Sequence, residues 1–167
     1  MELKIVIEKK GKLFEGKAPD IIAEELTSAM YEATGFLEEM VKAGTPRGVF
    51  GEQGGLASTI FGEVVEKGTP AVKGLVGHQS KYGEVIEKGR TAGKTWPPEG
   101  SLVRWMQVKL GMDEKTAQKM EFVVRRKIGK KGFTGAHMFD NAIVKGWSTL
   151  EKIFNERGFN IARRLDE

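Results

Sequence analysis

The stretch PDIIAEELTSAMYEATGFLEEMVKAG, residues 19–44, has a helical period along its whole length. Its apolar residues recur at spacings of four and three, which places them on one side of an α-helix; they are Ile22, Leu26, Ala29, Ala33, Phe36 and Met40. On the other side of the helix, the side chains that should face solvent are those of Glu24, Glu25, Glu38, Glu39 and Lys42. Because Pro19 and Asp20 suit a helix start and Gly44 with Pro46 suits a helix end, we predict a long helix here.

A second long helix is predicted near the C-terminus by the same kind of period. Its apolar residues recur at intervals of four, four, three and four, and they are Phe139, Ile143, Trp147, Leu150 and Phe154. Gly158 is expected to close this helix. Trp147 lies in the middle of the apolar stripe, so we expect it in the core.

Short strands are predicted before the first helix and between the two helices. Leu3, Ile5 and Ile7 indicate a first strand, and residues 12–14 a second extended piece. Residues 62–68 and 71–77 predict two strands joined by the turn at Thr69-Pro70. The segment 82–87 suits either a strand or one helical turn. Of the 22 glycines, 13 lie between Gly44 and Gly100, so the remainder of the region 44–98 is expected to consist of turns and loops.

Two shorter helices are predicted at 99–110 and 113–128. The first should turn Leu102, Val103, Met106 and Leu110 inward and end at Gly111. The second should begin at Asp113 as N-cap and bury Ala117, Met120, Val124 and Ile128. A turn at 129–135 follows. The sequence therefore predicts one α+β domain over 1–167, in which two long helices pack on a small antiparallel sheet and 99–128 is a helical insertion.

Composition and charge limit the function further. The absence of cysteine excludes a disulfide framework and a thiolate nucleophile and suits a reducing cytoplasm. The sequence has no signal-peptide pattern and no apolar run of membrane-spanning length, so we expect no membrane partner. Residues 1–66 have 7 Lys/Arg and 12 Asp/Glu, a net of −5, whereas residues 67–167 have 20 and 11, a net of +9. This asymmetry suits either nucleic-acid binding or head-to-tail stacking.

Motifs that would indicate catalysis are incomplete. Gly93-Lys94-Thr95 resembles the end of a phosphate-binding loop, but Lys88 occupies the position of the required earlier glycine, and Trp96-Pro97-Pro98 replaces the helix start. His78 and His137 show no metal-ligand spacing on a confidently predicted helix, and the sequence contains no Gly-x-Ser-x-Gly elbow. We therefore expect a protein that is not an enzyme and that uses no cofactor or metal.

Nucleic-acid binding is the alternative that the sequence leaves open. Residues 104–131 have nine Lys/Arg against three acids, and the two short helices resemble a helix-turn-helix. However, Asp113-Glu114 would lie where such a motif reads bases, so we expect at most non-specific DNA contact. Tryptophan is typical of interfaces as well. The candidate interface or DNA-facing residues are Tyr82, Trp96, Trp105, Arg104, Lys109, Arg125, Arg126, Lys127, Lys130 and Lys131.

Several strings in this order resemble the small neck and tail-completion proteins of long-tailed bacteriophages, which include minor tail components and head-tail connectors. They are Thr45-Pro46-Arg47, then Leu56-Ala-Ser-Thr-Ile60, then Tyr82-Gly-Glu-Val-Ile-Glu-Lys-Gly89. Pro97-Pro98 follows, with Trp105 and Lys109-Leu110-Gly111 in the next helix. The match ends with Val124-Arg-Arg-Lys-Ile128 and Gly132-Phe-Thr-Gly135 before Phe139. It covers about residues 20–155, and Gly54-Gly55, Arg90 and Ala136-His137 depart from the family pattern.

The resemblance implies an α+β subunit of a hexameric ring in the virion neck or tail. Its implied partners are copies of itself, portal or adaptor proteins and tail-tube proteins, and its implied location before assembly is the host cytoplasm. Head-closure, adaptor and tail-terminator proteins all remain open as the specific layer. The basic, non-enzymatic nucleic-acid-binding module of prophage origin is the alternative function.

Overall fold

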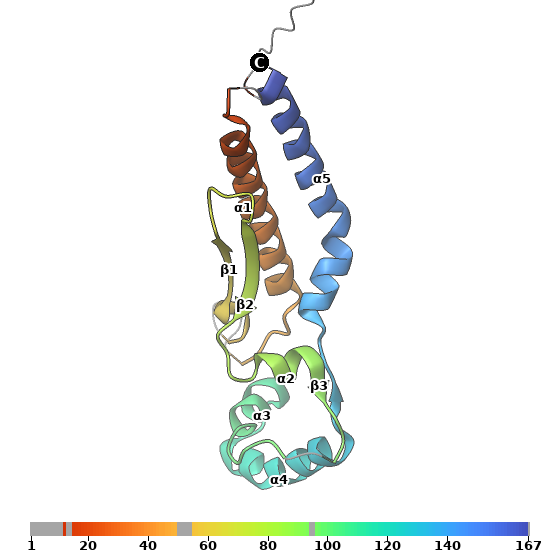
Figure 1. Cartoon of the computed structure of the whole chain (residues 1–167). Helices are drawn as coiled ribbons and strands as arrows, with labels where there is room; N and C mark the ends of the chain where they lie inside the picture. The colour runs from red at the N-terminus through yellow and green to blue at the C-terminus, as the bar shows by residue number, and fades with distance from the viewer. Residues whose placement is uncertain (1–11, 13–14, 50–54, 94–95, 167) are drawn as a thin grey trace, which may run out of the picture. The chain divides into compact units, whose positions relative to one another are not determined.

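The computed structural model describes residue 12 and residues 15–49, 55–93 and 96–166, and within them it is an α+β protein, as predicted (Figure 1). The predicted strand at 3–7 lies outside the described residues, and so does most of the extended piece at 12–14. Its helices are α1 (Ala18–Gly44), α2 (Gly83–Lys88), α3 (Val103–Leu110), α4 (Glu114–Lys131) and α5 (Met138–Asp166), with a 3-10 turn at Ala57–Thr59. Its strands are β1 (Ile60–Val65), β2 (Lys73–His78), β3 (Gly89–Arg90) and β4 (Phe133–Thr134).

Backbone contacts divide the chain into two compact units. The first unit contains residues 1–37, 62–76 and 145–167, and the second contains residues 38–61 and 77–144. Both long helices pass from one unit into the other. The division therefore leaves the single domain over 1–167 as a prediction.

In the first unit, α1 and α5 run antiparallel and touch through small side chains. Ala29 and Ala33 of α1 are buried with Ile153 of α5, and Leu150 packs against them. Alanine at the contact lets two helix backbones approach closely, so few large side chains are needed to exclude water. This explains why a thin contact is enough to join two long helices.

Ion pairs extend the same contact along the two helices. Arg164 reaches Glu24 at 2.7 Å and Glu25 at 2.9 Å, and Arg157 reaches Glu32 at 3.1 Å and Glu25 at 3.6 Å. The prediction that Glu25 faces solvent is wrong, since Glu25 is only 9% exposed. Its burial is possible because two guanidinium groups from α5 compensate for the lost hydration of the carboxylate.

The β1–β2 hairpin confirms the two strands and the turn at Thr69-Pro70 that the sequence predicts. It lies alongside α1 in Figure 1. Within the first unit, the backbone N–H of Gly68 donates to Thr27 Oγ1 at 3.0 Å, and a Cβ at Gly74 would lie 2.2 Å from Thr34 Oγ1. The hairpin therefore needs glycine at position 74 to approach α1 this closely.

The C-terminal helix is confirmed, but the prediction that Gly158 closes it is wrong, because Gly158 keeps a helical backbone and α5 continues to Asp166. Its buried face also differs from the predicted one. Met138, Ala142, Gly146 and Ile153 are buried, whereas Trp147 is 61% exposed. The prediction that Trp147 lies in the core is therefore wrong. The buried set is offset from the predicted stripe by about a quarter of a helical turn. In the first unit, Ala29 and Ala33 of α1 pack against Ile153 and Leu150, and Trp147 lies outside this contact.

In the second unit, glycines allow a tight junction between α2 and the start of α5. The segment 82–87, which the sequence left ambiguous, forms helix α2, and β3 follows it at once and pairs antiparallel with β4. A Cβ at Gly135 would lie 2.0 Å from the carbonyl oxygen of Glu87, and one at Gly132 would lie 2.0 Å from that of Arg90. The sequence does not predict this second, two-residue pairing, since it depends on contacts distant in sequence.

Candidate functional site

The candidate residues are concentrated in the α3–α4 pair of the second unit, whose local structure follows from its end signals. Gly111 takes the left-handed conformation, with φ of 65°, and ends α3. The Asp113 carboxylate then accepts a hydrogen bond from the Thr116 backbone N–H at 3.1 Å and caps α4. This cap and the Thr116 hydroxyl hold the pKa of Asp113 below its ordinary value. The structure confirms both predicted helix ends, the C-cap at Gly111 and the N-cap at Asp113.

The interface between α3 and α4 is narrow. Met106 of α3 and Ala117 of α4 are fully buried, and Leu102, Val103, Val124 and Ile128 are half-buried. Leu110 and Met120, predicted to face inward, are exposed instead. A pair of short helices has only one seam to bury, so residues at the edges of each predicted apolar face remain in solvent.

Glu121 is a structural residue that sequence reasoning missed. Its carboxylate is 5% exposed and accepts hydrogen bonds from the backbone N–H groups of Gly100 and Leu102, each at 3.0 Å. It therefore satisfies free donors at the start of α3 from the neighbouring helix. The available signal was its position, because Glu121 lies between Ala117 and Val124 on the buried side of α4.

Two of the predicted interface residues are partly used inside the α3–α4 region. Trp96 meets Phe122 edge to face, with ring centroids 5.6 Å apart, and its indole lies against Gly129, where a Cβ would come within 2.3 Å. Arg125 donates to the Pro97 carbonyl at 2.7 Å and lies 3.9 Å from Glu99. Helix α4 continues through Gly129 to Lys131, three residues beyond its predicted end, and Gly132 is its C-cap.

The other predicted cations are exposed and unpaired. They are Arg104, Lys109, Arg126, Lys127, Lys130 and Lys131, and the same holds for Lys115 and Lys119. Within the part of the chain that the structure describes, none of these eight residues forms an ion pair. The structure thus brings together most of the basic residues singled out from the sequence. Trp105 lies on α3 with 39% exposure, and Tyr82, next to α2, is exposed but belongs to a different surface.

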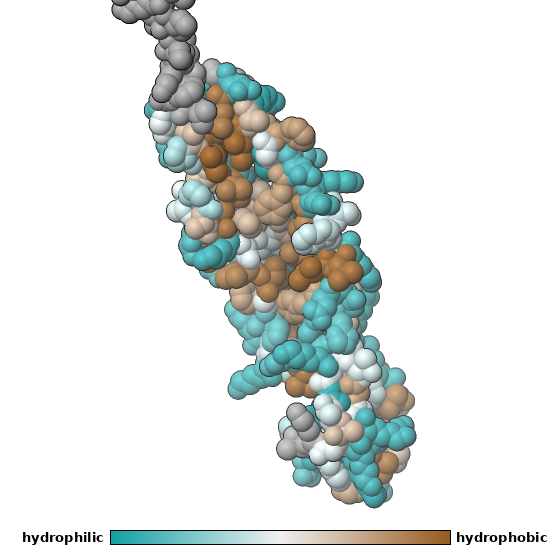
Figure 2. Space-filling view, turned by 45° about the vertical axis from the view of Figure 1, so that its right-hand side comes forward, coloured by the Kyte–Doolittle hydropathy of each residue, from teal (hydrophilic) through white to brown (hydrophobic). Residues whose placement is uncertain are grey.

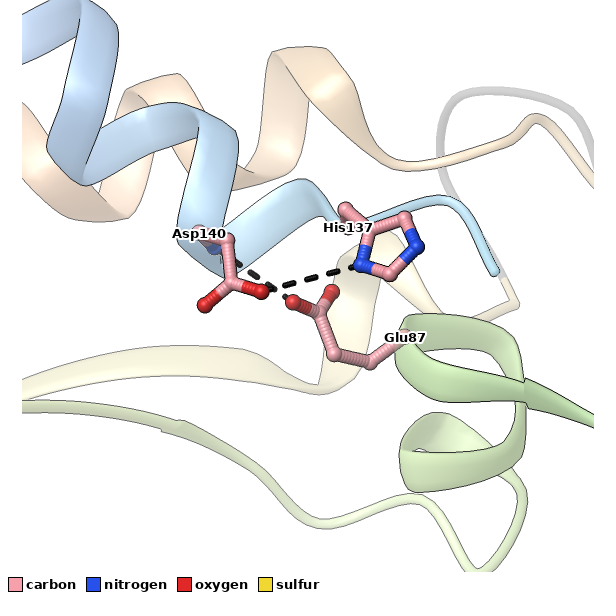
Figure 3. Close-up of side chains that lie close together, drawn as sticks. All are labelled: Glu87, His137 and Asp140. Atoms are coloured by element: carbon pink, nitrogen blue, oxygen red, sulfur yellow. Dashed lines mark hydrogen bonds and ion pairs between the residues drawn. The ribbon is translucent and has the colours of Figure 1, made fainter. Parts of the chain in front are cut away.

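A cluster of Glu87, His137 and Asp140 lies at the start of α5 (Figure 3). The Glu87 carboxylate accepts from the backbone N–H of Phe139 at 3.2 Å and of Asp140 at 3.4 Å, and His137 Nδ1 lies 3.6 Å from Asp140 Oδ2. Sequence reasoning did not find these two carboxylates beside His137. Both oxygens of Glu87 are already engaged by the backbone, so capping of α5 accounts for its position.

Large apolar side chains are also exposed along α5. Trp147 and Phe154, both in the first unit, are seven residues apart, so they project from one side of the helix, and we call them the α5 apolar face. The view in Figure 2 brings this helix forward and shows apolar surface between charged residues. Exposed apolar groups aligned in this way are typical of surfaces that bind other proteins.

No protein-family model, curated protein or solved structure matches the chain. None of the described helices is long and apolar enough to cross a membrane.

Proposed function

We propose that this chain is a structural subunit of the neck or tail-completion ring that joins head and tail in a phage or prophage virion. The observation that supports the proposal most directly is the α5 apolar face. A monomeric protein gains nothing from leaving Trp147 in water, whereas a subunit buries it when it assembles. The order of motifs that resembles the neck proteins supports the same function.

The occupant that we assign to the α5 apolar face is a second copy of the chain in a hexameric ring. The face extends for about 10 Å along the outer side of a helix, which suits contact with another protein better than a pocket for a small ligand. Lys145, Glu151, Lys152 and Glu156 on the same helix carry both signs of charge. Mixed charge around an apolar centre suits a contact with an equivalent subunit.

The experiment is addition of the purified protein to tails, and separately to portal-bearing heads, isolated from the cognate phage. Electron microscopy should show a new ring of density on one of the two particles, and the particle identifies the neck layer. Absence of added density on both particles would contradict the proposed function.

A double variant tests the surface assigned to self-assembly. Trp147→Ser with Phe154→Ser should abolish ring formation on the particles but change the free energy of unfolding of the free subunit by only about 0.5 kcal/mol per site, because both side chains are exposed. Ile153→Val is the matched control on the buried side of α5, and it should lower stability slightly yet leave ring formation intact. Rings formed normally by the double variant would exclude the α5 apolar face as the contact.

A further inference from the structure

The exposed cations of α4 form an ordered row. Lys115, Lys119, Arg126 and Lys130 are spaced by four, seven and four residues, so they project within about 60° of one another around the helix axis. We call these four residues the basic stripe. It extends for about 22 Å along the helix. Phe122 and Val123 flank it and are both more than half exposed.

The stripe forms no ion pair with any residue that the structure describes, although Asp113 and Glu114 adjoin Lys115 at the start of α4. Helix α3, against which α4 packs, contains no acidic residue, and the buried Glu121 is occupied with backbone N–H groups. Asp113 and Glu114 lie at the opposite end of α4 from Lys130, and Glu99 lies nearest to Arg125, outside the stripe. Four aligned positive charges therefore remain for a partner to neutralise.

Part of the acidic front of a second copy is unavailable to this charge. In the first unit, Glu24, Glu25 and Glu32 already pair with Arg157 and Arg164. Pairing them with the stripe of another subunit would break these contacts and leave Glu25 buried with fewer cations. Asp20, Glu39 and Glu63 are exposed and form no ion pair with a described residue, so an acidic protein surface is the alternative that the test must distinguish.

A nucleic-acid backbone presents negative charges in a regularly spaced row, which matches the row of cations on α4. Double-stranded DNA presents one phosphate about every 3.4 Å along each strand, so a row of cations about 22 Å long can contact several phosphates at once. We propose that the basic stripe of α4 binds the phosphate backbone of double-stranded DNA without reading its sequence. This contact goes beyond ring assembly, and it uses residues other than those of the α5 apolar face.

Sequence-independent binding follows from which end of the helix is basic. Base readers of the helix-turn-helix type place the N-terminal residues of the second helix in the major groove. Here that end has Asp113 and Glu114, whose carboxylates repel phosphate. The basic stripe projects from another side of α4 than Glu114, and phosphate contacts of this kind position a protein on DNA without specifying sequence.

The test is a titration of fluorescently labelled DNA duplexes of about 20 base pairs with the full-length protein, followed by anisotropy at several salt concentrations. With four phosphate contacts, the slope of log K against log[salt] should be about −3.6. Two duplexes of unrelated sequence should bind equally. The triple variant Lys119→Gln, Arg126→Gln and Lys130→Gln should lose more than about tenfold in affinity at low salt, and its slope should fall to about −0.9.

A matched variant separates the stripe from the net charge. Lys81, Lys145 and Lys152 are exposed lysines outside α4 that form no ion pair with any residue the structure describes. Changing these three to Gln removes the same total charge and should leave the slope unchanged. Far-UV circular dichroism should show both triple variants folded, since every altered side chain is exposed or solvent-facing.

Three results would overturn the proposal. One is the absence of duplex binding by the wild-type protein at low salt. Another is an equal loss of affinity in the two triple variants, which would assign binding to overall charge. The third is binding of poly-glutamate as tightly as DNA with the same dependence on the stripe, which would assign it to an acidic protein partner. Ring formation on phage particles is measured separately, so failure here is distinguishable from failure of the proposed function.

Discussion

The arginines of α5 and the cations of α4 carry the same charge but have different surroundings in the two units. Arg157 and Arg164 are held by three glutamates of α1, with atoms as close as 2.7 Å. The basic stripe of α4 has no acidic partner among the described residues. The difference shows that the fold neutralises one group of cations internally and leaves the other exposed to solvent.

The cause of the difference is the composition of the neighbouring helix. Helix α5 lies against α1, which has glutamates at 24, 25 and 32 along the contact. Helix α4 lies against α3, whose sequence VRWMQVKL adds two further cations and no acid. Neutralisation by a partner element is therefore available to α5 and unavailable to α4. The hydrogen bonds that Arg157 donates to Glu32 and Arg164 donates to Glu24 accordingly raise the pKa of both arginines.

The largest effect is expected from damage to the α3–α4 pair on which the basic stripe depends. Met106→Ala removes a fully buried side chain and leaves a cavity between the two helices, so it should lower the free energy of unfolding by about 2–5 kcal/mol. Thermal or urea denaturation measures the loss. Met120→Ala, at an exposed methionine of α4, is the control and should change stability by less than about 1 kcal/mol. Equal losses in the two variants would mean that the seam between α3 and α4 is not where the structure places it.

A smaller effect should separate paired from unpaired cations. Arg157→Met removes the partner of Glu32 and one of the two partners of the buried Glu25, so stability should fall by about 1 kcal/mol after allowance for partial exposure to solvent. Lys152→Met, on the same helix but without an ion pair, should stay within about 0.5 kcal/mol of the wild type. Urea denaturation of both variants makes the comparison. If Lys152→Met were as damaging as Arg157→Met, the contrast between the two groups of cations would not hold.

The sequence predicts what depends on local signals. Helix ends at Gly44, Gly111 and Asp113 were found because each end uses residues within a few positions. The spacing of apolar residues predicts the wrong buried face where one helix has two apolar faces. In α5 the stripe containing Trp147 has more apolar area, yet Ile153 on another face is buried, because Ala29 and Ala33 of α1, far away in the sequence, pack against it.

The candidate site shows the same limit. The basic residues of 104–131 were identified from composition, and the structure adds which of them align in a stripe. The sequence predicts that Glu25 faces solvent, and it predicts no role for Glu121. Both carboxylates are buried, and the sequence does not show this because their partners, Arg164 for Glu25 and the Leu102 N–H for Glu121, lie far away in the chain. A carboxylate between apolar positions of a helix is the one local hint of such a role. The contact of Trp96 with Gly129 corresponds to no pattern in the sequence around either residue.

The smallest effect concerns pH and the N-cap of α4, the acidic end of the helix that contains the basic stripe. The Thr116 hydroxyl and backbone N–H donate to the Asp113 carboxylate and lower its pKa in the folded state. Stability from a group of this kind is complete above the unfolded pKa of about 3.9 and is lost as pH falls through the lower folded pKa. Asp113→Asn keeps an acceptor oxygen but cannot ionise. The difference in Tm between wild type and Asp113→Asn should therefore be present at neutral pH and shrink below about pH 4.

Thr116→Val separates this mechanism from a general acid effect. It removes the hydroxyl that makes the largest contribution to the pKa shift and keeps the backbone N–H, so the pKa of Asp113 should rise toward its ordinary value. Carboxyl-detected NMR titration of Asp113 in the two proteins measures the change directly. An unchanged titration in Thr116→Val would show that the backbone cap alone holds the charge. The acidic end of α4 would then be fixed by helix geometry, with no contribution from the threonine side chain.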